Sequence, residues 1–462
     1  MKKLTKRWQM FLYAIGGMGV NMLNLMMGSY LCSAIIASGF DKIEAVKNQT
    51  FGGLVGTTAD GKGIGLDLVI LGLWAAIGLG AKILDGIIDV PMASFTDRLK
   101  TKFGRRRPAL IIGLVPMIIA YVLFALVTPE LRENSLMNTI FYGVILCVFY
   151  SFYTLTMVTY YATFTEIVDN VDDRNFISNV KSVCDIVYFI LGYVVVSAML
   201  GSMNIRLVAI LVLPLVLTML IPLFLIKERS TLPEDNEGQE LVTDESETNL
   251  RTVGLVKSLV SCLRDKNYII WMVVYAFMTF GVQLFLSGIN EFFASTDMSM
   301  MFVMMASFAP VPFTLILYNK ITEKWGFMAA YAYTLVIFGL GMIAMYFIGQ
   351  MPSGTPKFVC SIVGGVIASF SIGSLFSVAY SVPAQLAADE EKRTGISNSA
   401  MYFAVQGLFS GVASGIGGTA VLTLLKAKDL VPYMTLVCAA GMIVALALSF
   451  FLPKSVKMLG KK

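Results

Sequence analysis

The 462-residue chain contains no histidine, and only 14% of its residues are charged. Soluble globular domains carry about one quarter charged residues, so this composition is unusual for them. The lack of histidine removes a common metal ligand and the most usual proton-relay side chain. The six cysteines are scattered without metal-ligand spacing, and no GxxxxGK[ST] loop occurs. Neither a metalloenzyme nor an ATP-driven pump is therefore indicated, and we expect no enzyme activity and no cofactor.

Apolar residues make up most of the rest of the chain, which is 57% hydrophobic and has a mean hydropathy of +0.76. A helix needs about 20 apolar residues to cross a bilayer. We predict an all-α membrane protein with twelve spans, at 10–35, 67–96, 108–128, 138–164, 178–200, 206–226, 268–292, 299–319, 327–350, 358–387, 396–425 and 431–453. The basic start followed by an apolar run is similar to a signal peptide. Because the run continues through Leu31 without a clear cleavage site, we interpret it as the first span.

The basic residues predict the orientation of these spans. Clusters such as Lys2, Lys3 and Lys6, and Arg105 to Arg107, all fall on one side, whereas the opposite loops hold few lysines and arginines. Cytosolic loops of membrane proteins carry this excess of positive charge. We therefore predict a multi-pass protein of the cell membrane with both termini in the cytosol.

The chain also divides into two halves that resemble each other. An acidic interval, 227–267, separates residues 1–226 from residues 268–462, and its end has the pattern of a helix lying on the membrane surface. TDRLKTKFG after span two resembles YNKITEKWG after span eight, and VDDRNFISN after span four resembles DEEKRTGISN after span ten. Two six-helix repeats around a linker resemble the plan of a major facilitator transporter.

Span two contains two carboxylates, Asp85 and Asp89, with Lys82 one turn before Asp85 on the same helix face. At 1.5 Å per residue, Asp85 lies roughly 16 Å from the cytosolic end of the span. A charge at that depth is costly unless it faces water, a partner or an ion. The two carboxylates can ligate a cation such as Na⁺, or one of them can carry a proton. Alternatively, Lys82 and a neighbouring helix neutralise them in a structural ion-pair network.

The segment DRLKTKFGRRRP follows directly on the cytosolic side of span two. Asp97 is predicted to cap a neighbouring helix or to pair with an arginine. We assign gating and topology, rather than substrate binding, to Asp97, Arg98, Gly104, Arg105 and Arg106, and likewise to Arg174 and Arg393 in the loops after spans four and ten.

The stretch LDGIIDVPMASFTDRLKTKFGRRRP resembles the glycoside-pentoside-hexuronide:cation symporters, the branch of the major facilitator superfamily that includes the melibiose carrier. The matching positions are Asp85, Asp89, Pro91 and Gly104 to Pro108. The resemblance implies that Asp85, Asp89 and the span-four hydroxyl of Thr154 bind the coupling cation. It also places Tyr161 at an aromatic position beside the sugar.

The same resemblance assigns the substrate site and reveals differences from the family. Lys82 and Lys181 stand where the family has basic residues, whereas Asn21, Met157 and Gln406 replace two acids and a lysine, and Ile88 replaces an asparagine. We therefore expect a substrate other than a galactoside. The substrate-binding residues are predicted to be Asn21, Lys82, Tyr153, Met157, Tyr161, Lys181 and Gln406. Asp185, four residues after Lys181, is predicted either to line this pocket or to form a local ion pair.

Together these patterns predict a secondary transporter that moves a sugar, glycoside or related neutral or amphipathic solute together with Na⁺ or H⁺. The alternative is an uncoupled facilitator, or a transporter of an amphipathic, lipid-like or aglycone-type solute, in which the span-two aspartates are structural. We expect the partners to be a small-molecule substrate and membrane lipid, with no nucleic acid, and we expect a monomer.

Overall fold

The computed structural model describes residues 4–35, 69–126, 135–167, 171–200, 202–203, 205–228, 230–232, 263–394, 399–459 and 461. Every regular element in these ranges is a helix. The chain forms two compact units, Met1–Thr243 and Asp244–Lys462, and the division falls within the interval 227–267. Most of that interval, including most of the predicted surface helix, lies outside the described residues.

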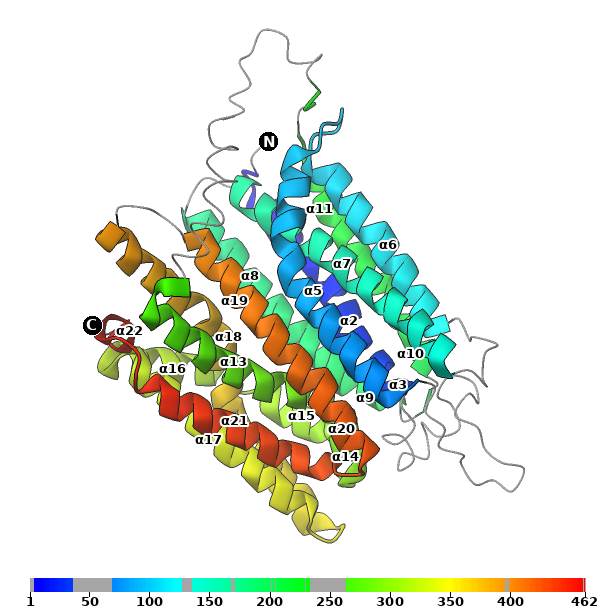
Figure 1. The fold of residues 1–462 in the computed structure, drawn as a ribbon, viewed down its shortest axis with the longest axis vertical. Coiled ribbons are helices and arrows are strands. Elements are labelled where there is room, and N and C mark those ends of the chain that lie inside the picture. Colours follow the sequence, from blue (N-terminus) through cyan, green and yellow to red (C-terminus); the bar gives the residue numbers. More distant parts are fainter. Residues whose placement is uncertain are drawn as a thin grey trace. The chain divides into compact units, whose positions relative to one another are not determined.

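The N-terminal unit contains the six predicted spans of the first half (Figure 1). Its helices are α1 (Arg7–Ile15), α2 (Gly17–Leu25), the π-helical turn η1 (Met26–Leu31), α3 (Cys32–Ala34), α5 (Leu71–Arg98), α6 (Arg106–Leu126), α7 (Ser135–Ile167), α8 (Val171–Ile190), the π-helical turn η4 (Leu191–Val195), α9 (Val196–Leu200), α10 (Ile205–Val212), the 3₁₀ turn η5 (Leu213–Met219) and α11 (Leu220–Leu225). Helix α7 packs against both α5 and α6. This packing places residues of spans two and four next to each other.

Small residues allow span one to approach span six closely. A Cβ atom on Gly19 would lie 1.8 Å from the backbone oxygen of Leu215, so only glycine fits there. The amide of Gly19 donates to the hydroxyl of Thr218 at 3.2 Å, and that hydroxyl donates to the oxygen of Gly16 at 3.1 Å. Close backbone approach with a hydroxyl hydrogen bond is a common way to join helices in a bilayer.

Among the residues that the structure describes, three spans contain a wide π-helical turn, namely η1, η4 and η7 (Ile416–Val421). Two of these turns meet, because the Tyr30 hydroxyl of η1 donates to the backbone oxygen of Gly192 in η4 at 2.6 Å. The hydroxyls of Ser29 and Tyr193 lie 3.2 Å apart at the same contact. Such turns occur frequently at functional sites.

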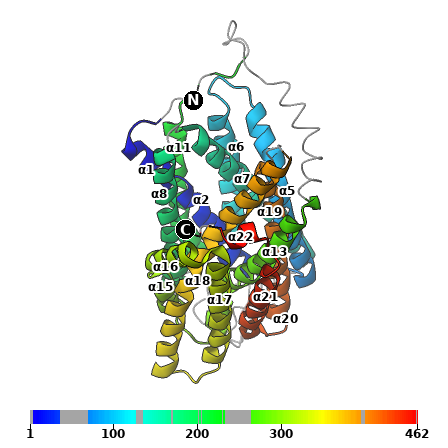
Figure 2. The same cartoon turned by 90° about the vertical axis from the view of Figure 1, so that its left-hand side faces the viewer.

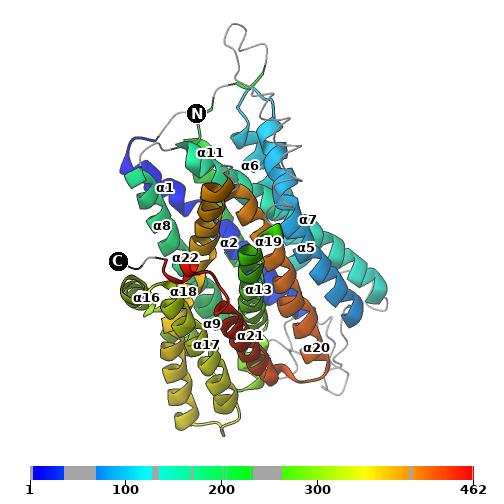
Figure 3. The same ribbon diagram turned by 60° about the vertical axis from the view of Figure 1, so that its left-hand side comes forward.

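The C-terminal unit is a second helical bundle, seen from two further sides in Figures 2 and 3. Its elements are α13 (Lys266–Ser287), α14 (Ile289–Ser295), α15 (Met300–Phe308), α16 (Val311–Trp325), α17 (Phe327–Gly349), α18 (Thr355–Thr394), α19 (Ser399–Gly415), η7, α20 (Leu422–Ala427), the 3₁₀ turn η8 (Val431–Tyr433), α21 (Met434–Ser449) and α22 (Lys454–Lys457). Helix α21 packs against α13 and α17.

Eleven helices of the described residues are long and apolar enough to cross a membrane. The predicted eighth span is interrupted, because α15 ends at Phe308 and α16 begins at Val311. Pro310 and Pro312 lie at this break, and proline lacks the amide hydrogen that would continue a helix. Neither helix alone has the required length, so the count of twelve spans stays a prediction.

Candidate functional site

A carboxylate and a hydroxyl from two different spans meet in the N-terminal unit. The Thr154 hydroxyl of α7 donates a short hydrogen bond to Oδ1 of Asp85 in α5. Thr154 is 4% exposed, and Asp85 is half-buried. A hydroxyl that donates one hydrogen bond keeps two lone pairs for a further partner. The hydroxyl that the family resemblance assigned to the cation site thus contacts Asp85, and the two side chains present oxygen atoms from two helices.

Lys82 lies one turn before Asp85 and turns its ammonium group toward an aromatic ring. Its Nζ atom is 3.8 Å from the centroid of the buried Tyr150 ring on α7. A cation over an aromatic face is attracted by the ring quadrupole, more strongly where water is excluded. Lys82 therefore adds a positive charge and a second contact to the interface of α5 and α7. The assignment of Lys82 to substrate binding stays a prediction.

A second polar network lies on the neighbouring face of α7. The Tyr153 hydroxyl donates to Oδ1 of Asn21 in α2 at 3.1 Å. The amide Nδ2 of Asn21 lies 3.5 Å from Oδ1 of Asp185 in α8, a long hydrogen bond. Nζ of Lys181 is 3.3 Å from Oδ2 of the same carboxylate. Four residues from spans one, four and five thus form one chain of contacts.

Aromatic and thioether groups flank this network on α7. Tyr153, Met157 and Tyr161 are spaced four residues apart, so they follow one face of the helix. Met157 is buried, whereas Tyr161 is 40% exposed. The ammonium of Lys181 lies 4.8 Å from the centroid of the Tyr161 ring. Tyr153 therefore contacts Asn21 and Tyr161 lies beside Lys181, with Met157 between them along the same face of α7.

Gln406 belongs to the other unit. It lies on α19, is 6% exposed, and its Oε1 atom accepts from Nε1 of Trp271 in α13 at 2.8 Å. This contact joins spans eleven and seven. A role of Gln406 in substrate binding stays a prediction.

The segment between spans two and three is held by the residues that follow span six. Gly104 has φ +85°, a conformation that favours glycine, and Glu228 lies against it. Oε2 of Glu228 accepts from the backbone amides of Arg106 at 2.7 Å and Arg107 at 3.4 Å, which satisfies the start of α6. Glu228 therefore caps the start of α6.

We call the contact between residues 226–232 and residues 99–107 the clasp. Further hydrogen bonds hold these two segments together. The Thr101 amide donates to the Thr231 hydroxyl at 2.9 Å, and the Thr231 amide donates to the oxygen of Thr101 at 3.0 Å. Nη1 of the buried Arg106 donates to the Thr96 hydroxyl at 3.1 Å. Arg106 therefore packs inside the unit, and the predicted gating loop has a fixed backbone on its span-three side.

Several predicted site residues have helical backbone positions, but their side chains lie outside the described part of the structure. Asp89, Asp97 and Arg98 are on α5, Arg174 is in the first turn of α8, and Arg393 is in the last turn of α18. Asp89 lies one turn after Asp85, as the spacing requires. Arg105 precedes α6 and is half-buried. The roles assigned to these residues stay predictions.

The sequence reasoning missed a buried ion pair in the C-terminal unit. Nζ of Lys426 in α20 lies 2.9 Å from Oε1 of Glu291 in α14, and both side chains are 1% exposed. The predicted eleventh span ends at residue 425, so it leaves Lys426 just outside. The available signal was a single charge at the end of each of two apolar runs, with Glu291 following the glycine at position 288.

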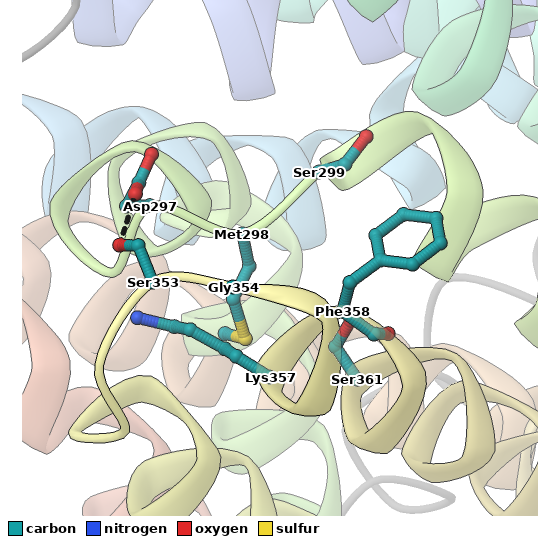
Figure 4. Close-up of a pocket in the computed structure, with 8 residues that line it drawn as sticks. All are labelled: Asp297, Met298, Ser299, Ser353, Gly354, Lys357, Phe358 and Ser361. Atoms are coloured by element: carbon teal, nitrogen blue, oxygen red, sulfur yellow. Dashed lines mark hydrogen bonds between the residues drawn. The ribbon is translucent and has the colours of Figure 1, made fainter.

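A pocket of about 350 Å³ lies in the same unit, between the turn before α15 and the turn before α18 (Figure 4). The Ser353 hydroxyl donates to Oδ2 of Asp297 at 2.5 Å. Nζ of Lys357 donates to the backbone oxygens of Gly349 and Met351 at 3.1 and 3.0 Å. Both charged groups of this pocket therefore hold turns of the chain in place.

The fold is similar to that of several solved structures. A peptide transporter, POT, superposes with a TM-score of 0.64 and 14% identity over 99% of this chain and 97% of that one. The nucleoside transporter NupG gives a TM-score of 0.59 and 12% identity, covering 97% and 99% of the two chains. A bacterial homologue of the human lysosomal transporter Spinster, inward-facing and unoccupied, gives 0.58 and 12%, with 97% of each chain covered. At these identities the likeness shows the fold alone.

No curated protein matches the chain, so the family assignment rests on the comparison with family models. The model of the family described as MFS/sugar transport protein matches residues 12–452, nearly the whole chain. This family and the similar structures are membrane transporters, which agrees with the apolar helices and with the resemblance drawn from span two. The chain therefore belongs to the MFS/sugar transport protein family of multi-pass membrane transporters.

Proposed function

We propose that the chain is a cation-coupled secondary transporter that moves a neutral sugar, glycoside or related solute by alternating access. The observation that carries the proposal is the contact between Asp85 and Thr154, because it brings a carboxylate and a hydroxyl from two spans together within apolar helices. Carboxylate and hydroxyl oxygens suit a hard cation such as Na⁺. Asp89, one turn later on α5, is the expected third ligand, and a proton on either carboxylate is the other form of coupling.

Coupling requires the two solutes to favour the same conformation. Occupancy changes a conformational equilibrium only through unequal affinity for its states. The network of Tyr153, Asn21 and Asp185 is the candidate substrate site, since Tyr153 directly precedes Thr154 on α7. We further propose that the protein acts as a monomer in the cell membrane, with both termini in the cytosol and no cofactor.

One observation favours a second candidate, an uncoupled facilitator or a carrier of an amphipathic solute. The ammonium of Lys82 lies at the α5 and α7 interface, one turn from Asp85, so the fold itself provides a positive charge near this carboxylate. In that case Asp85 stabilises the bundle and binds no ion. Both candidates predict a destabilised Asp85→Asn variant, but only the first predicts ion-dependent stability.

Thermal unfolding of the purified protein in detergent, measured against Na⁺ concentration and pH, separates the two. A ligand that binds only the folded state stabilises it by RT ln(1 + [L]/Kd), about 2.7 kcal/mol at 100 times Kd. We expect Na⁺ to raise the melting temperature of the wild type and to have no effect on Asp85→Asn or Thr154→Val. Choline chloride at equal ionic strength is the control for screening.

The other outcomes of this experiment assign a different role to Asp85. A pH dependence that disappears in Asp85→Asn, without any effect of Na⁺, supports proton coupling. If neither ion changes the stability of the wild type, coupling is wrong and the facilitator remains. Asp429→Asn is a matched control, because it makes the same chemical change at an exposed turn of the other unit.

A further inference from the structure

We propose that Asp185 is a substrate-binding carboxylate that recognises two adjacent hydroxyl groups of a neutral solute. Asp185 lies on α8, within span five, where a charge must face water, a partner or a ligand. The inference rests on the proposed transport of a neutral solute, and it names a side chain that binds the hydroxyl groups of that solute.

The carboxylate is accessible, unlike the other ion pair of the described residues. The side chain of Asp185 is 35% exposed and that of Lys181 is 27% exposed, whereas Glu291 and Lys426 are 1% exposed each. Glu291 and Lys426 come from two helices, α14 and α20. Asp185 and Lys181 are instead on one helix, four residues apart, so the pair joins no two spans.

Asp185 retains capacity to accept hydrogen bonds. Its Oδ1 accepts from Asn21 at 3.5 Å and its Oδ2 from Lys181 at 3.3 Å. An ionised carboxylate has about four lone-pair directions, so about two remain for a ligand. Hydroxyl groups that donate to a charged carboxylate make the stronger class of hydrogen bond.

The charges around Asp185 select a neutral ligand. Lys181 offsets the charge of Asp185 at a distance of 3.3 Å, so the pair as a whole attracts neither a cation nor an anion strongly. A diol fits both members, since one hydroxyl donates to the carboxylate while the other accepts from the ammonium. The partly exposed ring of Tyr161, 4.8 Å from the same ammonium, offers an apolar face to the C–H groups of a sugar ring.

The position of Asp185 also links the solute to the ion. Asn21, which contacts Asp185, accepts from the hydroxyl of Tyr153, and Tyr153 is followed on α7 by Thr154, which binds Asp85. A solute that draws Asn21 and Asp185 together therefore also holds Tyr153 in place through its hydrogen bond to Asn21. Because Thr154 follows Tyr153 on α7, the position of Thr154 is held as well. The affinities of the two sites must then be coupled reciprocally.

A binding experiment on the full-length protein in detergent tests the role of Asp185. The probes are methyl β-D-galactoside, methyl β-D-glucoside, D-xylose and myo-inositol, all neutral polyols, with cyclohexanol as a probe that lacks a diol. Each is titrated while thermal unfolding is followed, in the presence of Na⁺. We expect at least one polyol, and not cyclohexanol, to stabilise the wild type. Asp185→Asn should weaken that polyol by about tenfold or more, because hydrogen bonds to the charged carboxylate are lost.

Two further variants protect the test against a folding defect. Asp185→Glu keeps the ion pair but moves the carboxylate by one methylene. It should therefore fold like the wild type and yet bind the polyol more weakly than the wild type does. Asp429→Asn should bind the polyol like the wild type. Equal affinity in wild type, Asp185→Asn and Asp185→Glu overturns the role of Asp185, and a wild type that responds to none of the polyols overturns the substrate class.

The same samples separate this inference from the proposed coupling. If Na⁺ stabilises the wild type through Asp85 while the polyol affinity does not depend on Asp185, only the present inference fails. If polyol binding depends on Asp185 but neither Na⁺ nor pH has an effect, only the coupling fails.

Discussion

The two ion pairs of the described residues are built in opposite ways. Lys181 and Asp185 are neighbours on one helix and remain open to ligands, whereas Glu291 and Lys426 come from two helices and are sealed. The sealed pair joins the ends of spans seven and eleven, next to the break at Gly288 and the π-helical turn η7. The sealed pair joins two spans, whereas the open pair is the one that we propose offers its groups to a solute.

The largest expected effect comes from breaking the sealed pair. Glu291→Gln leaves the ammonium of Lys426 buried without its charged partner. Removal of one member of a buried pair typically costs about 3–5 kcal/mol. We expect a large fall in the melting temperature in detergent, or loss of folded protein. A melting temperature within one degree or so of the wild type would mean that the pair is not sealed in the folded protein.

An intermediate effect distinguishes charge from packing at the same place. The double variant Glu291→Leu with Lys426→Met removes both charges and keeps most of the volume. Replacement of a buried pair by apolar side chains is often neutral or stabilising by about 1–4 kcal/mol. We expect the double variant to regain at least the stability that Glu291→Gln loses. A double variant as unstable as the single one would show that the pair specifies the contact in a way that packing cannot replace.

The smallest effect is expected at the open pair in the absence of solute. A pair four residues apart on a helix contributes about 0.3–0.5 kcal/mol, and salt screens it. Lys181→Gln should therefore change the melting temperature little, and the change should shrink when choline chloride raises the ionic strength. A loss as large as that of Glu291→Gln would make Lys181 and Asp185 a structural pair and would contradict the comparison.

The sequence predicted the features that one segment can specify. Apolar runs fixed most spans, because a backbone in lipid must satisfy its hydrogen bonds within the helix. The acid spacing in span two identified Asp85, and the family resemblance supplied Thr154 as its neighbour. The contact of Glu291 with Lys426 depends on two segments 135 residues apart, so no local pattern reveals it.

Local helix geometry was equally hidden from the sequence. The break between α15 and α16 needs two prolines to act within an otherwise continuous apolar run, and we interpreted that run as one span. The π-helical turns η1 and η4 depend on packing between spans one and five rather than on residue type. The network through Tyr153, Asn21 and Asp185 was predicted only as a set of candidates, since its order follows from how three helices meet.

The clasp at residues 226–232 has a consequence for how the chain can vary in length. Thr231 and Glu228 hold a loop more than 120 residues earlier in the sequence, through hydrogen bonds to its backbone. The part of the N-terminal unit that holds its own loops therefore extends through Leu232 and does not end with α11. Insertions, reporter domains or protease sites belong beyond that residue, because a cut or a shift before it would release the loop that begins span three.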